Sequence, residues 1–279
     1  MKASFTLIPA ESRRLIAKAI VQMEEVKIAL KKAYIVINGG TTNGYVAQEL
    51  AGVDVKPEEF TAGTVSHRLL CVTDLPPKRK LPFPIILYKG QQVDKTIPEV
   101  FQDFHVETVL IKGANCIDSQ GNVGVISAGF DGGTVGATIG TVVSQGLKYI
   151  VAVGLEKLVP SVDKAASVAG AKSLDYSMGA DYGIFKLPNA VVVTEIEAFN
   201  ILAGVEATHI GSGGIGEAVG SVSLIVEGEQ SRVKNAIRMV ESIKGEPVLP
   251  GFKGTCETCP YSCIFAGKKV QDLPPWLVD

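Results

Sequence analysis

The chain has 279 residues, of which 46% are hydrophobic, which is enough apolar material for one large domain or two ordinary ones. Lysine and arginine total 27 against 29 acidic residues, so the formal net charge of -2 provides no general field to attract nucleic acid or an anionic membrane. The N-terminus lacks a signal-peptide pattern and no apolar run approaches the roughly 20 residues that span a bilayer, so we expect a cytoplasmic protein. Any anionic ligand must then be held by a local site.

Helix-like and strand-like segments alternate through the first part of the chain. Apolar residues between Ser12 and Ala33 recur at helical spacing, with Ser12 or Glu11 able to cap the start of the helix. Strand-sized apolar runs and further helices follow at 34–37 (strand), 41–50 (helix), 69–73, 85–88 and 108–112 (strands), 134–146 (helix) and 149–153 (strand). This order predicts an α/β fold over residues 1–174, a three-layer core with a mixed, mostly parallel sheet.

A second, smaller unit is predicted over residues 175–245. Its expected elements are a strand at 190–194, a helix at 195–203, strands at 205–210 and 221–227, and a helix at 230–243. The order β-α-β-β-α is most of a ferredoxin-like α+β arrangement. Residues 246–279 are rich in proline, glycine and cysteine, so we expect an irregular tail that a metal or the main body must hold.

Glycine-rich turns lie next to two of the predicted helices. The first contains Gly39, Gly40, Thr41, Thr42 and Asn43 at a helix N-terminus, where free N–H groups and the helix dipole attract a phosphate or carboxylate. Another such turn contains Asp131, Gly132, Gly133 and Thr134. Because open α/β sheets bind ligands at the carboxyl ends of their strands, we expect these turns to bind a small anionic molecule. Glycines that only shape a tight turn are the alternative.

Polar residues follow the strand predicted at 108–112. Asn115 and Asp118 could hydrogen-bond a hydroxylated substrate, and Asp118 could act as a catalytic acid or base if burial raised its pKa. A simple polar turn at Asp118 is equally consistent with the sequence. Arg68, after another loop, could bind a phosphate through its fork of donors or could lie on the surface beside His67.

The order of these segments resembles that of the ribose-5-phosphate isomerases. The runs VINGGTTNGYVAQEL, FTAGTVSHRL, VLIKGANCID, GFDGGTVGATIG and YIVAVGLEKLVPSV stand where that family has its GTGST-type loop, TS-type loop, DGADE-type strand end, KGGGG-type turn and DESKLV segment. The resemblance covers about residues 33–162 and implies the fold shared with CoA transferases, followed by a small ferredoxin-like domain. It implies an isomerase- or transferase-like enzyme acting on a phosphorylated or carboxylated metabolite.

Departures from the family pattern leave the reaction open. Asn115 and Cys116 stand where the isomerases have acids, and Thr138 stands where they have a glutamate base. These side chains cannot shuttle a proton as a carboxylate does, and the glycine-rich turns lack the nucleophilic glutamate of a CoA transferase. The alternative function is a non-catalytic ligand sensor or assembly protein, because SVSLIVEGEQSRVKNAIRMVE resembles bacterial microcompartment shell domains. We expect a homo-oligomer in either case.

The tail carries the most distinctive local motif, formed by Cys256, Cys259 and Cys263. The C-x-x-C spacing lets two thiolates hold one ion, and the third thiolate can supply another corner of a tetrahedral site. We therefore predict zinc or an iron–sulfur cluster as cofactor. The fourth ligand would come from Cys71, from Cys116, from a histidine or from outside the chain. A redox disulfide and plain free thiols are the alternatives.

Overall fold

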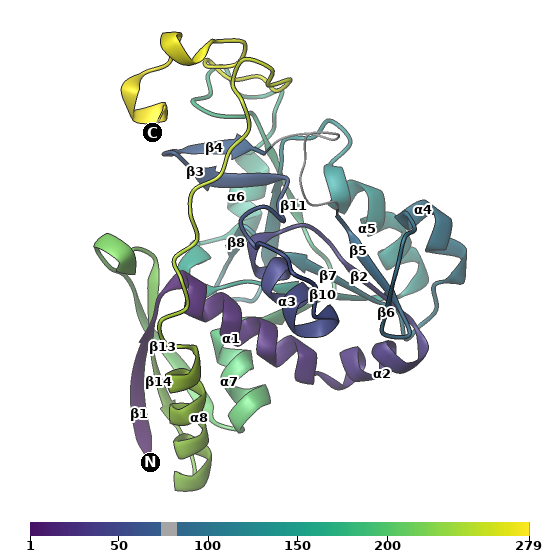
Figure 1. The fold of residues 1–279 in the computed structure, drawn as a ribbon, viewed down its shortest axis with the longest axis vertical. Coiled ribbons are helices and arrows are strands. Elements are labelled where there is room, and N and C mark those ends of the chain that lie inside the picture. The colour runs from purple at the N-terminus through teal and green to yellow at the C-terminus, as the bar shows by residue number, and fades with distance from the viewer. Residues whose placement is uncertain (74–82, 279) are drawn as a thin grey trace.

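A six-stranded sheet forms the centre of the computed structural model, which describes residues 1–73 and 83–278 (Figure 1). Its strand order is β12-β10-β7-β2-β5-β6. The strands are β2 (Tyr34–Ile37), β5 (Ile85–Tyr88), β6 (Gln91–Val93), β7 (Val109–Gly113), β10 (Lys148–Ala152) and β12 (Ala190–Val193). β2, β7, β10 and β12 are parallel, and β5 is antiparallel to both of its neighbours. The predicted α/β fold with a mixed, mostly parallel sheet is confirmed.

Both faces of this sheet are apolar, and helices cover both of them. Ile35 and Ile37 of β2 belong to one hydrophobic cluster with α1 (Pro9–Gln22), α2 (Glu24–Lys32) and α3 (Thr41–Ala51). Tyr34 and Val36 belong to a second cluster with α4 (Ile97–Val100) and α5 (Gly133–Gln145). Successive side chains of a strand point to opposite faces, so this alternation produces three layers.

The predicted helix from Ser12 to Ala33 is two helices. α1 begins at Pro9, whose missing N–H is tolerated in the first turn, and the Glu11 carboxylate accepts the Ile8 N–H at 3.0 Å. Ser12 therefore lies inside the helix rather than at its cap. Met23 has an extended conformation and separates α1 from α2.

A smaller antiparallel sheet has the order β1-β14-β13, from β1 (Lys2–Leu7), β13 (Glu206–Gly213) and β14 (Ser221–Glu227). α7 (Glu195–Ala203) contacts β13, and α8 (Gln230–Ile243) contacts β1. This differs from the unit expected over 175–245, because the strand at 190–194 is β12 at the edge of the central sheet, and the N-terminal β1 supplies the third strand. One hydrophobic cluster includes Leu7, Ile16 and Leu224, so both sheets share a core.

Shorter elements lie beside the central sheet. β8 (Cys116–Ile117), β9 (Val123–Ser127) and β11 (Gly183–Lys186) form a three-stranded sheet, and α6 (Val162–Val168) packs on it. β3 (Gly63–Ser66) and β4 (Leu69–Val72) form a hairpin. No helix of the described residues is long and apolar enough to cross a membrane.

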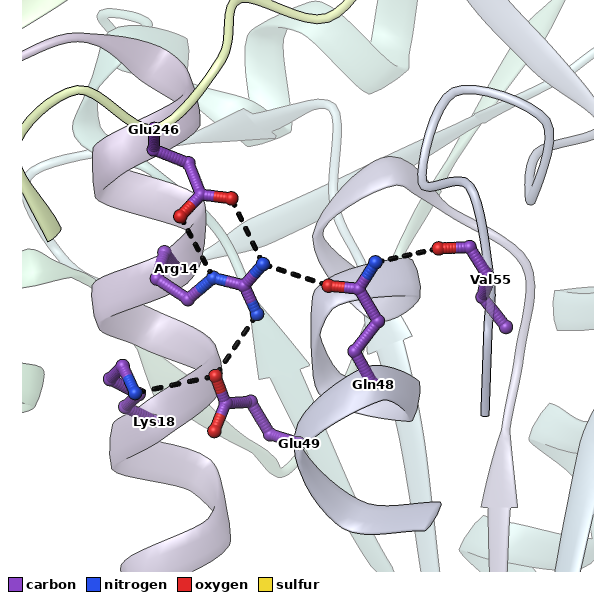
Figure 2. Close-up of polar contacts among 6 residues, drawn as sticks. All are labelled: Arg14, Lys18, Gln48, Glu49, Val55 and Glu246. Atoms are coloured by element: carbon purple, nitrogen blue, oxygen red, sulfur yellow. Dashed lines mark hydrogen bonds and ion pairs between the residues drawn. The ribbon is translucent and has the colours of Figure 1, made fainter. Parts of the chain in front are cut away.

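After α8 the chain runs past α1 to the β3–β4 hairpin (Figure 1). We call residues 246–254 the strap. Glu246 at its start binds the Arg14 guanidinium of α1 through two contacts of 3.1 and 2.9 Å (Figure 2). At its far end, the Ser66 hydroxyl donates to the Phe252 carbonyl at 2.9 Å, and the Gly254 N–H donates to Val72 at 2.9 Å. The strap is therefore fastened at both ends.

Candidate functional site

The chain leaves β2 and β7 toward opposite faces of the sheet. α3 follows β2 and packs in the first hydrophobic cluster, whereas α5 follows β7 along the chain and packs in the second. β2 and β7 are parallel neighbours, so their carboxyl ends flank the point at which the topology switches direction. Ligands of open α/β sheets bind in the crevice at such a point.

The first glycine-rich turn lies on this crevice, directly after β2. Gly40 precedes α3 with a φ of 154°, and no side chain caps the helix. The first intrahelical acceptor is the Gly40 carbonyl, which receives the Gly44 N–H at 2.9 Å. The amides of Thr41, Thr42 and Asn43 therefore have no acceptor within the helix, and they point toward whatever lies beyond its N-terminus.

A cavity of about 140 Å³ opens at this helix end, and we call it the α3 pocket. Arg13 of α1, Thr41 of α3 and Glu58 line it, together with residues 64–66 of the hairpin and 249–252 of the strap. A buried cavity of about 150 Å³ holds a molecule of benzene size, so the α3 pocket suits a ligand of about six to eight non-hydrogen atoms. A cation, free amides and hydroxyl groups favour a carboxylate or phosphate, and Glu58 can accept a hydrogen bond from a hydroxyl or amino group of the same ligand.

Not every residue of this turn faces the pocket. Thr42 and Asn43 are buried, and the Asn43 amide donates to the Asn38 carbonyl at 2.7 Å. Asn43 therefore fixes the turn from behind. Of the predicted residues Gly39 to Asn43, only Thr41 lines the cavity.

The carboxyl end of β7 meets this turn through Lys112. The Lys112 ammonium donates to the Gly39 carbonyl at 3.0 Å. Asn115 instead accepts the Ile126 N–H at 3.0 Å and so organises the β8–β9 hairpin.

Asp118 also has a structural role. Its carboxylate accepts hydrogen bonds of about 3.0 Å from the backbone of Gln120, Asn122 and Val162 and from the Asn122 side chain. Burial by itself would raise the pKa of Asp118, but these hydrogen bonds hold it below its usual value. The condition for a catalytic Asp118, a raised pKa, is therefore not met, and the polar-turn interpretation fits the geometry.

The other predicted ligand-binding residues lie outside the α3 pocket. Gly132 precedes α5 with a φ of 78°, and Asp131 accepts the Gly133 N–H at 2.9 Å, which closes the turn on itself. Thr134 accepts the Thr138 hydroxyl through its carbonyl at 2.7 Å. Arg68 is exposed in the two-residue turn of the β3–β4 hairpin, where its φ is 62°. None of these residues lines the cavity.

Arg13 also belongs to a group of partly or fully buried charged residues that we call the charge cluster. Its members are Arg13, Lys112, Glu156, Lys157 and Glu195. Glu156 is 11% exposed and lies 3.8 Å from the Arg13 guanidinium and 3.7 Å from the Lys157 ammonium. Glu195 begins α7 and accepts the Leu155 N–H at 2.9 Å. Lys112 lies at the end of β7, Glu156 and Lys157 follow β10, Glu195 follows β12, and Arg13 lies on α1, so the carboxyl edge of the sheet brings these residues together.

Several polar atoms of the charge cluster are unsatisfied. In the described parts of the chain, both Glu156 oxygens and Arg13 Nε are buried without a hydrogen-bond partner, although Glu156 Oε1 has ion pairs with Arg13 and Lys157. The Glu156 carboxylate also lies directly against Gly154, so a Cβ atom at position 154 would collide with it. Unsatisfied buried groups are rare in folded proteins and mark places where function outweighs stability.

Two members of the charge cluster titrate near neutral pH. Burial, and secondarily the charge of Glu156, raises the pKa of Glu195 to about 7. Burial, and secondarily the charge of Lys157, lowers the pKa of Lys112 to about 8. Burial also lowers the pKa of Lys157. Groups shifted in this way toward physiological pH are suited to proton transfer.

The sequence prediction missed the charge cluster. Lys112, Glu156 and Lys157 all stand within runs that carry the family resemblance, but they were not selected as site residues. Lysine at the end of an otherwise apolar buried strand, as in Leu110-Ile111-Lys112, is the signal that could have identified one of them.

The predicted cysteine ligands lie in the tail, away from the α3 pocket. All five cysteines are free thiols. Within residues 1–73 and 83–278, no three His, Cys, Asp or Glu side chains are already arranged as metal ligands.

Comparisons with protein families, curated proteins and solved structures find no match to this chain.

Proposed function

We propose that the protein binds a small anionic metabolite, carrying a carboxylate or phosphate group, in the α3 pocket. The observation that carries this proposal is that Arg13 and the uncapped N-terminus of α3 face the same cavity at the topological switch point. A guanidinium, a helix dipole and free amides together favour an anion far more than any of them alone. The volume of about 140 Å³ favours a small acid over a nucleotide.

An enzyme fits this site better than a sensor because of the charge cluster. Arg13 belongs both to the pocket and to the cluster, so a bound anion would lie one side chain away from Glu156. Glu195 and Lys112, with pKa values of about 7 and 8, could exchange protons during a reaction. Kinship with the isomerase and CoA-transferase superfamily is part of this proposal, with these groups in place of Asp118 as the acid and base.

The experiment is a calorimetric titration of the full chain with inorganic phosphate and with a panel of three- to five-carbon hydroxy acids and sugar phosphates. Thr41→Glu places a carboxylate at the first position of α3, where it favours the helix but occupies the anion site. We expect binding to the wild type, at least tenfold weaker binding to Thr41→Glu, and unchanged binding to Arg238→Gln on the exposed face of α8. Equal binding to all three proteins would refute the site.

Turnover separates the two functions. A ligand found by titration is incubated with the wild type and with Glu195→Gln, and the mixture is followed by proton NMR for chemical change or solvent-deuterium exchange. Exchange that is lost in Glu195→Gln supports the enzyme. Tight binding without exchange identifies a sensor instead.

A further inference from the structure

Four of the five cysteines come from two distant segments and meet at one place. Cys71 lies on β4, and Cys256, Cys259 and Cys263 lie in the tail more than 180 residues later. Cys71, Cys256 and Cys263 all pack against the small apolar cluster formed by Leu69, Phe265 and Leu277. The fifth cysteine, Cys116, is buried on β8 in another part of the molecule.

Backbone hydrogen bonds hold the tail near β4, one of them directly and the other through residues 180 and 181. Before the loop, the Gly254 N–H donates to the carbonyl of Val72, the residue next to Cys71, at 2.9 Å. Within the loop, the Ser262 carbonyl accepts the Asp181 N–H at 3.2 Å, and the adjacent Ala180 N–H donates to Leu70 at 2.9 Å. Cys71 and the three tail cysteines are therefore kept together by backbone contacts that do not depend on the thiols.

The loop is also closed on itself. The Cys256 carbonyl accepts the N–H groups of Cys259 at 3.1 Å and Gly267 at 2.9 Å. The Ala266 N–H donates to the Cys263 carbonyl at 3.0 Å. These contacts bring the three cysteines of an irregular segment onto one compact turn, which removes much of the loop-closure entropy that a ligand site would otherwise lose.

Hydrogen-bond donors and a cation face two of the sulfur atoms. The Phe265 N–H donates to Cys263 Sγ at 3.4 Å, and the Lys253 ammonium lies 4.0 Å from Cys256 Sγ.

We propose that Cys71, Cys256, Cys259 and Cys263 form a four-thiolate metal site, in which Cys71 is the ligand from outside the tail. Since no three of the described side chains yet converge as ligands, the thiols rotate inward as the metal binds. Each thiol releases its proton to solvent when its metal–sulfur bond forms. Four thiolates around a tetrahedral centre are typical of zinc or of a [4Fe–4S] cluster, and both share this ligand chemistry. The metal would fasten the tail to β4, whose hairpin partner β3 lines the α3 pocket.

The first test is the metal content of the full chain purified anaerobically without chelators, and again after incubation with zinc or with iron and sulfide. One zinc per chain, or four iron and four sulfide with visible absorption, supports the site and identifies the metal. No stoichiometric metal under any of these conditions overturns it.

The second test addresses Cys71 itself. Cys71→Ser should retain metal at least about tenfold more weakly than the wild type in competition with a chelator, whereas the control Cys116→Ser should match the wild type. Equal retention in the two variants would show that Cys71 is not a ligand. Thiol counting on the wild type covers the case in which Cys71→Ser does not fold. The number of thiols that react in the native protein should rise from at most one to five when the metal is removed under denaturing conditions, and four or more reactive thiols in the metal-loaded native protein would overturn the site.

Discussion

Arg14 should contribute more to stability than any single surface ion pair, because one guanidinium joins three segments. It binds Glu246 of the strap through two contacts, and Glu49 at 3.0 Å and Gln48 at 2.8 Å on α3 (Figure 2). Arg14→Met keeps an aliphatic stem but removes the guanidinium charge, together with the guanidinium carbon that lies 4.5 Å from the centre of the Tyr45 ring.

The expected loss follows from exposure. Arg14, Glu246 and Glu49 are 16%, 18% and 24% exposed, so they are neither fully buried nor freely solvated. Breaking a fully buried pair costs about 3–5 kcal/mol and an exposed pair less than about 1 kcal/mol. Lys18 remains 3.4 Å from Glu49 and compensates part of the change. We therefore expect Arg14→Met to lower the free energy of unfolding by about 2–4 kcal/mol.

Urea unfolding with two probes measures this loss. Trp276 is the single tryptophan and reports on the tail, whereas far-UV circular dichroism reports on the whole chain. In Arg14→Met the tryptophan transition should precede the dichroism transition, because the strap loses its anchor at Glu246. The double variant with Glu246→Gln should show a coupling energy of about 1–3 kcal/mol. A loss below about 0.5 kcal/mol, with no coupling, would refute this account of the strap.

Four further substitutions test the surroundings of individual groups by urea unfolding. Because the pKa of Glu195 is raised to about 7, the folded state retains a proton that the unfolded chain releases above pH 4.5. The free energy of unfolding of the wild type should therefore fall between pH 4.5 and about 7 relative to that of Glu195→Gln. Because the pKa of Lys112 is lowered to about 8, the free energy of unfolding of the wild type should rise between about pH 8 and 10.5 relative to that of Lys112→Met. If the wild type and a variant have parallel curves of unfolding free energy against pH, the pKa shift at that residue is contradicted. Gly44→Ala should lower the free energy of unfolding by about 1–3 kcal/mol, since its Cβ would lie 2.6 Å from Pro57 Cα. Gly140→Ala on α5 has open space around it and should raise the free energy of unfolding by about 0.5–1 kcal/mol.

Local patterns in the sequence were sufficient to predict most elements of the fold. Apolar runs such as 34–37 are strands buried on both faces, and Ser221–Glu227 is a strand as predicted. The partners of strands were harder to predict. β1 was missed although Ala3, Phe5 and Leu7 alternate with polar residues, because its partner β14 lies more than 200 residues away. β12 was assigned to the small unit because it precedes α7 directly, but its pairing with β10 places it in the central sheet.

The candidate site was predictable only where it is local. A strand, a glycine turn and a helix lie next to one another in sequence, so the candidate anion site at Thr41 could be predicted. The charge cluster could not, because Arg13, Glu156 and Glu195 become neighbours only when α1, β10 and β12 are assembled. The sequence leaves the role of Asp118 open for the same reason, since the Val162 N–H that donates to its carboxylate comes from 44 residues away.

The central claim, that the α3 pocket binds a small anion, is tested most directly by amide NMR of the full chain during titration with inorganic phosphate. We predict saturable shifts of the amides of Thr41, Thr42 and Asn43 in the wild type, and no such shifts at this helix in Thr41→Glu. The amides of Gly133 and Thr134 at the start of α5 serve as the internal control, because that turn is closed by Asp131. Shifts confined to Gly133 and Thr134, or no saturable shift at millimolar phosphate, would contradict the account.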